Sequence, residues 1–306
     1  MNKIKVVTIA GPTASGKSIL AMELAERFNG EIVSADSMQV YRYMDIGTAK
    51  PTKWQREKIP HYMIDAANPD EEFTAARYRD EASEAINWIH ERGKNIFIVG
   101  GTGLYIKALT KGLFKGPASD VRLRNEFAML GAGSEGTRHL HERLKEVDTD
   151  AASKIHPNNT ARIIRALEVY YLTNKSISIL QKEHNFSEEP YALLKIGLSV
   201  DRKFLYKCIE DRVDSMVEAG LAEEVRRLLA MGYSPGLKAM CGLGYKEIVM
   251  YIQNRCSLEH AVIEIKKNTR RYAKRQMTWF KRESDIKWLA YNEKEKAISL
   301  VEGFLG

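Results

Sequence analysis

This sequence of 306 residues lacks the features that mark several specialised classes of protein. No apolar run approaches the ~20 residues that a membrane-spanning helix needs, so we expect no membrane association. The three cysteines, Cys208, Cys241 and Cys256, are odd in number, widely spaced and without a C-x-x-C pair. They predict neither a disulfide framework nor a zinc site, and they suit a reducing cytoplasm. No charged segment followed by an apolar one opens the chain, so we expect no secretory leader.

Acidic residues are missing from one stretch in the last part of the chain. The whole sequence carries a net charge of +7, which alone is a weak indication of a polyanionic partner. Residues 266–282 concentrate that charge, because they hold eight basic residues and no acid. The eight are Lys266, Lys267, Arg270, Arg271, Lys274, Arg275, Lys281 and Arg282. Such a block is either a solvated helix face or a contact with nucleic acid.

The sequence does contain a glycine-rich stretch, residues 11–18, in an informative setting. An apolar run precedes it and an amphipathic run follows it, so strand, loop and helix come in the order that a P-loop requires. Its residues are Gly11, Pro12, Thr13, Ala14, Ser15, Gly16, Lys17 and Ser18. Loop amides and the helix N-terminus would point at phosphate oxygens, Lys17 would add a cation, and the Ser18 hydroxyl could ligate magnesium. The stretch therefore predicts that the chain binds a diphosphate or a triphosphate.

Short apolar runs alternate with helical patterns over the first 113 residues. Strands are expected at 4–10, 31–35, 61–65 and 95–99, with helices at 17–28 and 73–92. This alternation predicts an α/β fold in which a parallel sheet carries helices on both faces.

Strand-like runs then disappear over residues 114–190, which contain a clear amphipathic segment at 161–172. We therefore expect a small all-helical insertion domain there. The later part of the chain should return to the sheet, with strands at 193–200 and 286–289 and helices at 202–219, 221–231, 244–253 and 257–283. The sequence thus predicts one P-loop core, built from 1–113 and 191–306, interrupted by one insertion.

Polar residues follow the second and fourth expected strands, at the sheet edge where parallel α/β proteins bind ligands. Asp36 ends the second strand, where it could act as a general base or a magnesium contact, or could simply cap the next turn. Ser37, Gln39 and Tyr41 offer hydrogen-bonding and stacking groups suited to a nucleobase. Thr102 lies in a second glycine-rich turn and could reach the same ligand.

One feature of P-loop hydrolases is missing. Those enzymes usually have an apolar strand that ends in a magnesium-binding acid, whereas the apolar run 96–99 ends in Gly100. Asp36 could supply such an acid, but Ser-Met-Gln follows it. A simple ATPase or GTPase is therefore disfavoured.

Six motifs, taken together and in order, are more specific. They are GPTASGKS, DSMQVY, GGTGLY, IHPNN..RIIRALE, MCGLGYKE and KRQMTWF. In these motifs the chain resembles the tRNA dimethylallyltransferase (isopentenyltransferase) family over residues 6–283. The resemblance implies a nucleoside-triphosphate-hydrolase-like catalytic core. It also implies Mg²⁺-assisted transfer of a dimethylallyl group from its diphosphate to N6 of the adenosine 3′ of a tRNA anticodon.

The resemblance assigns roles to residues around the P-loop. Lys17, Ser18 and Mg²⁺ would stabilise the negative charge that grows on the departing diphosphate. Asp36 would take the N6 proton as general base, and Thr102 would hydrogen-bond substrate beside the reacting centre. Arg212 would help the P-loop to bind the diphosphate.

The resemblance also implies tRNA contacts in three parts of the chain. They lie at the ends of two strands, in the insertion, which would close over the anticodon stem-loop, and on the basic stretch, which would bind phosphates. These residues are Asp36, Ser37, Met38, Gln39, Thr102, Arg162, Arg165, either Arg122 or Arg124, Lys266, Arg270 and Lys274. Residues 238–247 resemble a further tRNA-facing segment. The aromatic residues of the basic stretch, Tyr272, Trp279 and Phe280, are expected to face the core.

Two other functions fit the P-loop by itself, namely a small-molecule kinase that uses ATP and an RNA-binding ATPase. A transferase would add one prenyl group to tRNA, a kinase would need ATP and give a phosphorylated product, and a mere binder would leave the tRNA mass unchanged.

Nothing in the sequence indicates an obligate dimer, so we expect a monomer. No zinc-finger pattern follows residue 283, which favours a bacterial-type member of the family.

Overall fold

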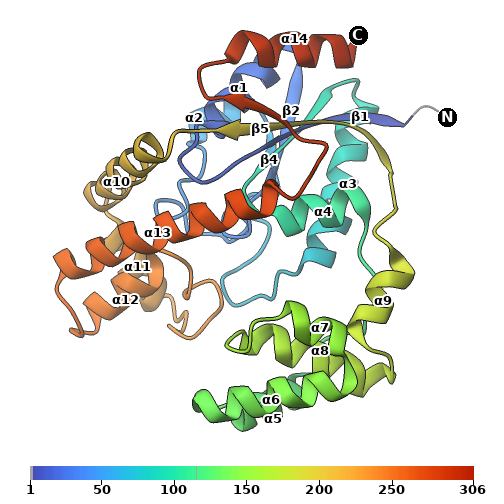
Figure 1. Cartoon of the computed structure of the whole chain (residues 1–306). Coiled ribbons are helices and arrows are strands. Elements are labelled where there is room, and N and C mark those ends of the chain that lie inside the picture. The colour runs from blue at the N-terminus through green and yellow to red at the C-terminus, as the bar shows by residue number, and fades with distance from the viewer. Residues whose placement is uncertain (1–2, 115) are drawn as a thin grey trace. The chain divides into compact units, whose positions relative to one another are not determined.

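The computed structural model describes residues 3–114 and 116–306. These residues form two compact units, which Figure 1 colours along the chain. The first unit runs through Thr110 and resumes at Glu189, and it holds the sheet. The second unit, Lys111–Glu188, is helical.

Six strands of the described chain form a single parallel sheet in the order β3-β2-β4-β1-β5-β6. They are β1 (Ile4–Ala10), β2 (Gly30–Ala35), β3 (His61–Tyr62), β4 (Asn95–Gly100), β5 (Tyr191–Ser199) and β6 (Lys287–Ala290). The predicted parallel α/β sheet is confirmed. The strand expected at 61–65 is shorter than predicted, because Met63 and Asp65 have positive φ angles of 62° and 56° that interrupt the extended backbone.

Alternate residues of each strand serve opposite faces of the sheet. In β1, Val6 joins the core on one face and Val7 the core on the other, and in β4 Ile96 and Phe97 divide in the same way. Side chains alternate along a strand, so a run that is apolar throughout requires cover on both faces. The sequence of these strands therefore dictates a sheet between two helical layers.

The helices of the first unit supply those two layers (Figure 1). Residues of α1 and α14 form the core on one face, and residues of α3, α4, α11, α12 and α13 pack on the other. The bounds are α1 (Lys17–Arg27), α2 (Lys53–Lys58), α3 (Ala75–Glu91), α4 (Gly103–Lys111), α10 (Arg202–Glu218), α11 (Leu221–Ala230), α12 (Tyr245–Ile252), α13 (Leu258–Phe280) and α14 (Lys294–Leu305). The predicted cover on both faces is confirmed.

The second unit has a small core of its own, around Phe127, Leu140 and Leu167. Its helices are α5 (Val121–Leu130), α6 (Gly133–Val147), α7 (Thr149–Lys154), α8 (Thr160–Thr173) and α9 (Ile177–His184). One acidic residue, Glu168, is fully buried within it. A buried carboxylate is costly unless it is paired, so Glu168 requires cationic partners within the unit.

Among the residues that the structure describes, no helix has the length and apolar character needed to cross a membrane.

Candidate active site

Three loops meet at one edge of the sheet because β2, β4 and β1 are neighbours and run in the same direction. The P-loop follows β1, Asp36 follows β2, and the turn that contains Thr102 follows β4. A direct backbone bond joins the last two, since the Thr102 amide donates to the Ala35 carbonyl over 3.1 Å. The fold therefore brings together three segments that are far apart in the sequence.

The P-loop keeps the start of α1 open to an anion. Gly16 precedes α1 with a φ of 85°, a left-handed conformation that suits glycine, and no side chain of the described residues caps the helix. The first amides of α1 therefore lack intrahelical acceptors and present a partial positive charge. In the loop itself, the Ser15 hydroxyl is buried without a hydrogen-bond partner among the described residues. These are the properties of a phosphate cradle.

Two cationic side chains, Lys17 and Arg212, are held close together next to this cradle. Burial, and then the charge of Arg212, lower the pKa of Lys17 from 10.5 to about 8, although Asp36 acts in the opposite direction. Burial also lowers the pKa of Arg212, again opposed by Asp36. The single negative charge of Asp36 offsets only part of the positive charge of Lys17 and Arg212. A bound polyanion would therefore reduce the repulsion between these two cations.

Asp36 has two functions at the end of β2. Its Oδ1 atom accepts a hydrogen bond from the Met38 amide at 2.9 Å, as a turn-capping aspartate does. The residue also lines the cavity that contains Lys17 and Arg212. Asp36 therefore caps the turn and faces the candidate site at the same time. An aspartate so placed has its backbone orientation fixed while the carboxylate faces the ligand space.

The turn after β4 is tied to both of the other loops. The Thr102 hydroxyl accepts a hydrogen bond from the Ser37 amide at 3.0 Å. Gln276 of α13, which is buried, accepts from the Thr13 amide at 2.9 Å and donates to the Gly101 carbonyl at 3.0 Å. One amide side chain thus fixes the spacing between the P-loop and the second glycine-rich turn.

The cavity above these loops has a volume of about 350 Å³. Its polar lining contains both cations and Asp36, and its apolar lining comes from α10, α13 and two loops. The apolar side chains are Met38, Ile209, Val213, Met216, Leu243 and Ile265. A smaller cavity of about 50 Å³ shares Thr13, Lys17, Asp36 and Arg212 with it and also reaches Ser18. The site can therefore hold a charged group beside an apolar one.

Tyr272 is a site residue that the sequence prediction missed. It was expected to face the core, whereas it lines the large cavity. Burial, and then the charge of Asp36, raise the pKa of Tyr272 to about 12, so it remains a neutral hydrogen-bonding group. Trp279 and Phe280 do pack in the core as expected. The sequence did hold one signal for this placement. A position surrounded by apolar side chains does not need a hydroxyl, and Tyr272 carries one.

The other predicted residues around the cavity divide into two groups. Ser37 and Met38 line the large cavity, together with residues 241–244 and Lys246 of the segment that was predicted to face tRNA. Gln39 lines the small cavity, but its side-chain amide is already bonded within the protein, donating to the carbonyls of Thr48 and Ala49 at 3.2 and 3.3 Å.

The predicted arginines of the second unit differ in what they contact. Arg124 and Arg165 both bind the buried Glu168, from Arg124 Nε at 2.8 Å and from Arg165 Nη1 at 2.5 Å. They stabilise that carboxylate inside the unit. Arg162 and Arg122 are exposed, and Arg122 pairs with Glu126 one helical turn away.

The basic stretch on α13 is likewise partly occupied. Lys266 pairs with Asp214 of α10 at 2.7 Å, and Arg270 pairs with Glu210 of α10 at 2.6 Å. Lys274 is exposed and forms no side-chain bond to another described residue. The exposed charges at positions 271, 274 and 275 share one helix face because they are spaced i, i+3, i+4.

This fold and this edge of the sheet define an α/β P-loop protein whose P-loop faces a partly apolar cavity. The family model for IPP transferase matches residues 39–283. The chain therefore belongs to the IPP transferase family, in agreement with the resemblance found in its motifs.

Individual relatives agree over almost the whole length. A tRNA dimethylallyltransferase of Geobacter metallireducens is 52% identical over 99% of this chain and 98% of the relative. A tRNA isopentenylpyrophosphate transferase of Bacillus halodurans, solved by crystallography, has a TM-score of 0.73 with 41% identity, covering 99% of this chain and 97% of that one. A eukaryotic dimethylallyltransferase described as acting on tRNA has a TM-score of 0.82 with 30% identity, covering 99% and 79%.

The lowered pKa of Lys17 gives a testable pH dependence. In the protein without ligand, the Lys17 amine is charged below pH 8 and can bind an anion directly. Above pH 8 the amine is mostly neutral, so it must take up a proton when the anion binds. We expect the affinity for dimethylallyl diphosphate, measured calorimetrically without tRNA, to fall up to tenfold per pH unit above about pH 8. Lys17→Arg, whose charge does not titrate in this range, should bind with little pH dependence. If the affinity of the unaltered protein and that of Lys17→Arg changed equally with pH, the pH dependence could not be assigned to Lys17.

Proposed function

We propose that this chain transfers the dimethylallyl group of dimethylallyl diphosphate to N6 of the adenosine 3′ of a tRNA anticodon. The observation that carries this proposal is that Lys17, Arg212 and Asp36 line one cavity. An anion-binding pair and a carboxylate in the same space suit a reaction in which an anion departs while a proton is removed. The names of the related proteins favour prenyl transfer over the kinase and ATPase alternatives.

On the donor side, the P-loop amides, Lys17 and Arg212 bind the diphosphate. The bond between C1 of the dimethylallyl group and the diphosphate oxygen breaks, and its electron pair stays on the oxygen. The two cations stabilise that growing charge most strongly because they are already fixed in place and partly removed from water. The apolar lining of the cavity accommodates the five-carbon group.

On the acceptor side, N6 of adenine forms the new bond to C1 and loses a proton to Asp36. The amine is a weak nucleophile, because its lone pair is delocalised into the ring, so removal of this proton is useful. The base must leave the anticodon-loop stack to enter the cavity. Ser37 and Tyr272 offer neutral hydrogen-bonding groups in the cavity, and the Thr102 side chain is hydrogen-bonded to both residues.

Magnesium is part of this proposal, and Ser18 is the residue that would hold it. The described residues contain no cluster of three or more histidine, cysteine or acidic side chains able to bind a metal by themselves. Mg²⁺ commonly uses one or two protein ligands, together with substrate phosphates and water, so Ser18 beside the bound diphosphate fits this chemistry. The ion would supply further neutralisation of the leaving group.

We also propose that both units contact tRNA. In the second unit the exposed Arg162 and Arg122 are better placed for this than Arg124 and Arg165, whose charges are engaged by Glu168. On α13, Lys274 is the favoured phosphate contact among the three residues predicted from the sequence, Lys266, Arg270 and Lys274. A monomer in the cytoplasm, where tRNA is available, completes the proposal.

Replacing Asp36 tests the catalytic role. Asp36→Asn keeps an oxygen that can accept from the Met38 amide, so the turn should survive while the base is lost. Mass spectrometry of tRNA after single-turnover reactions should show transfer slowed by about 10²–10⁴-fold. Binding of dimethylallyl diphosphate should be retained or tighter, because a negative charge is removed, and tRNA binding should weaken only modestly. Near-normal transfer, equal to that of an Asp70→Asn control at an exposed site, would remove Asp36 from its role.

The α13 charges can be tested through the salt dependence of tRNA binding. The double variant Arg271→Gln/Lys274→Gln should lower the slope of log K against log salt by about 1.5, as expected for two lost phosphate contacts. Lys266→Gln/Arg270→Gln removes the same charge, but from groups already paired with α10, so its slope should stay close to that of the unaltered protein. The reverse order of slopes would show that the paired face is the one in contact.

A further inference from the structure

A tight turn over residues 44–50 forms one wall of the large cavity. Gly47 and Thr48 line it directly. The Thr48 carbonyl accepts hydrogen bonds from Arg212 Nη2 at 3.4 Å and from the Gln39 amide at 3.2 Å. Because the same carbonyl contacts Arg212, the position of this turn affects the position of one of the two half-buried cations.

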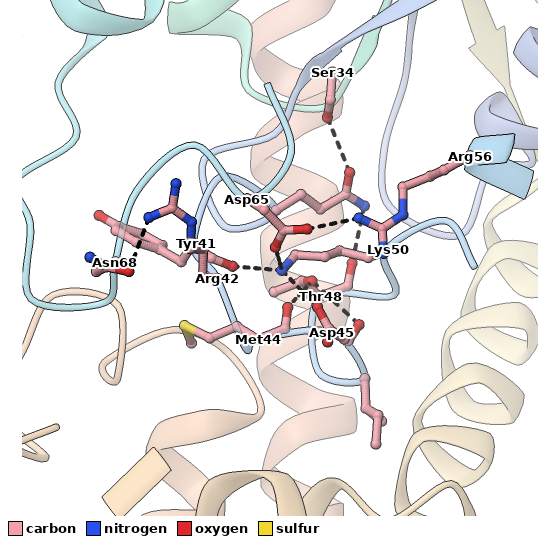
Figure 2. Close-up of polar contacts among 12 residues, drawn as sticks. Ser34, Tyr41, Arg42, Met44, Asp45, Thr48, Lys50, Arg56, Asp65 and Asn68 are labelled. Atoms are coloured by element: carbon pink, nitrogen blue, oxygen red, sulfur yellow. Dashed lines mark hydrogen bonds and ion pairs between the residues drawn. The ribbon is translucent and has the colours of Figure 1, made fainter. Parts of the chain in front are cut away.

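The end of the turn is fixed by a buried lysine, as Figure 2 shows. The side chain of Lys50 is 1% exposed, and its three N–H groups find three acceptors. These are the Tyr41 carbonyl at 2.6 Å, Asp45 Oδ1 at 2.7 Å and Asp65 Oδ1 at 2.6 Å. Within the turn, the Thr48 hydroxyl donates to the Met44 carbonyl at 2.6 Å.

The middle of the turn is held by Glu224, which belongs to α11 and is buried. Its Oε2 accepts from the amides of Asp45 and Ile46 at 2.9 and 2.8 Å. Its Oε1 accepts from the Gly47 amide at 3.2 Å and from the Tyr245 hydroxyl at 2.7 Å. All four partners are donors, which is the pattern of a carboxylate bound in a nest of consecutive backbone amides.

The residues around Glu224 keep its carboxylate in this acceptor role. Its partner Tyr245 is completely buried, and burial and the Glu224 charge raise the pKa of that phenol well above its usual value, so it stays a donor. The ring also packs so closely on the turn that a Cβ at Gly47 would lie 2.6 Å from it. Glu224 itself is not among the residues that line either cavity next to the P-loop.

From these contacts we propose that Glu224 is a positioning residue for diphosphate binding, acting through the 44–50 turn and the Thr48 carbonyl on Arg212. The chain of contacts is continuous from α11 through three amides to the guanidinium on α10. This role rests on the proposed function, in which Arg212 binds the diphosphate. The proposal adds a residue that no motif around the P-loop contains and that lies 177 positions in sequence from its nearest backbone partner, Gly47.

The test is Glu224→Gln, with Glu223→Gln as its matched control on the same helix. The new amide must turn an NH₂ group toward backbone or phenol donors, so at least one oxygen contact is lost. Glu223 is exposed and pairs with Arg226 of the same helix, so the control removes the same charge without touching the turn. We expect the Kd for dimethylallyl diphosphate, measured by calorimetry without tRNA, to rise about tenfold in Glu224→Gln and less than twofold in the control.

A cycle with Arg212→Lys separates positioning from general stability. If Glu224 acts through Arg212, then Glu224→Gln should change the Kd less than twofold in the Arg212→Lys background. An equal loss in both backgrounds would show a merely structural role and overturn the proposal. Tyr245→Phe, which removes one of the four donors, provides the same comparison with a smaller effect should Glu224→Gln not fold. If the unaltered protein binds dimethylallyl diphosphate but prenylates no tRNA, the proposed function fails and this cycle remains interpretable.

Discussion

Two half-buried positive charges that face the same space, Lys17 and Arg212, are the constraint on which the rest of the structure depends. Each is partly removed from water, and the charge of Asp36 opposes the lowering of both pKa values. Such an arrangement is unfavourable until an anion arrives, so its cost must be met by the surrounding packing and hydrogen bonds. The P-loop backbone, the 44–50 turn and Gln276 are the parts that keep the two cations and the carboxylate in place.

The parallel sheet explains why these parts can meet. Adjacent strands β2, β4 and β1 deliver three loops to one edge, and α10 and α13 close the space above them with Arg212 and Tyr272. In the proposed reaction, the charged groups for a leaving diphosphate, the carboxylate that takes a proton and the apolar lining for a prenyl group share one cavity. The sheet topology brings these groups together, and the residue types then determine what each group can do.

The sequence predicts the local pattern well and the long-range pairing poorly. Apolar alternation predicted the strands and the two-faced sheet, and the P-loop motif predicted the phosphate site. The helix α14 was missed because it buries only three of its residues, and Tyr272 was misplaced because helical spacing alone cannot say which neighbour covers a face. Glu224 could not be found, since its acceptor role depends on amides 177–179 positions away. Nor could the pairing of Lys266 and Arg270 with α10 be read from a run of charges.

The most direct measurement is a crystal structure with an anticodon stem-loop and an unreactive thio-analogue of dimethylallyl diphosphate. We expect the diphosphate on the P-loop amides, Lys17 and Arg212, with N6 of an extruded adenine within hydrogen-bond reach, roughly 3 Å, of Asp36. A diphosphate bound away from these cations, or an adenine whose N6 faces a group other than Asp36, would contradict it.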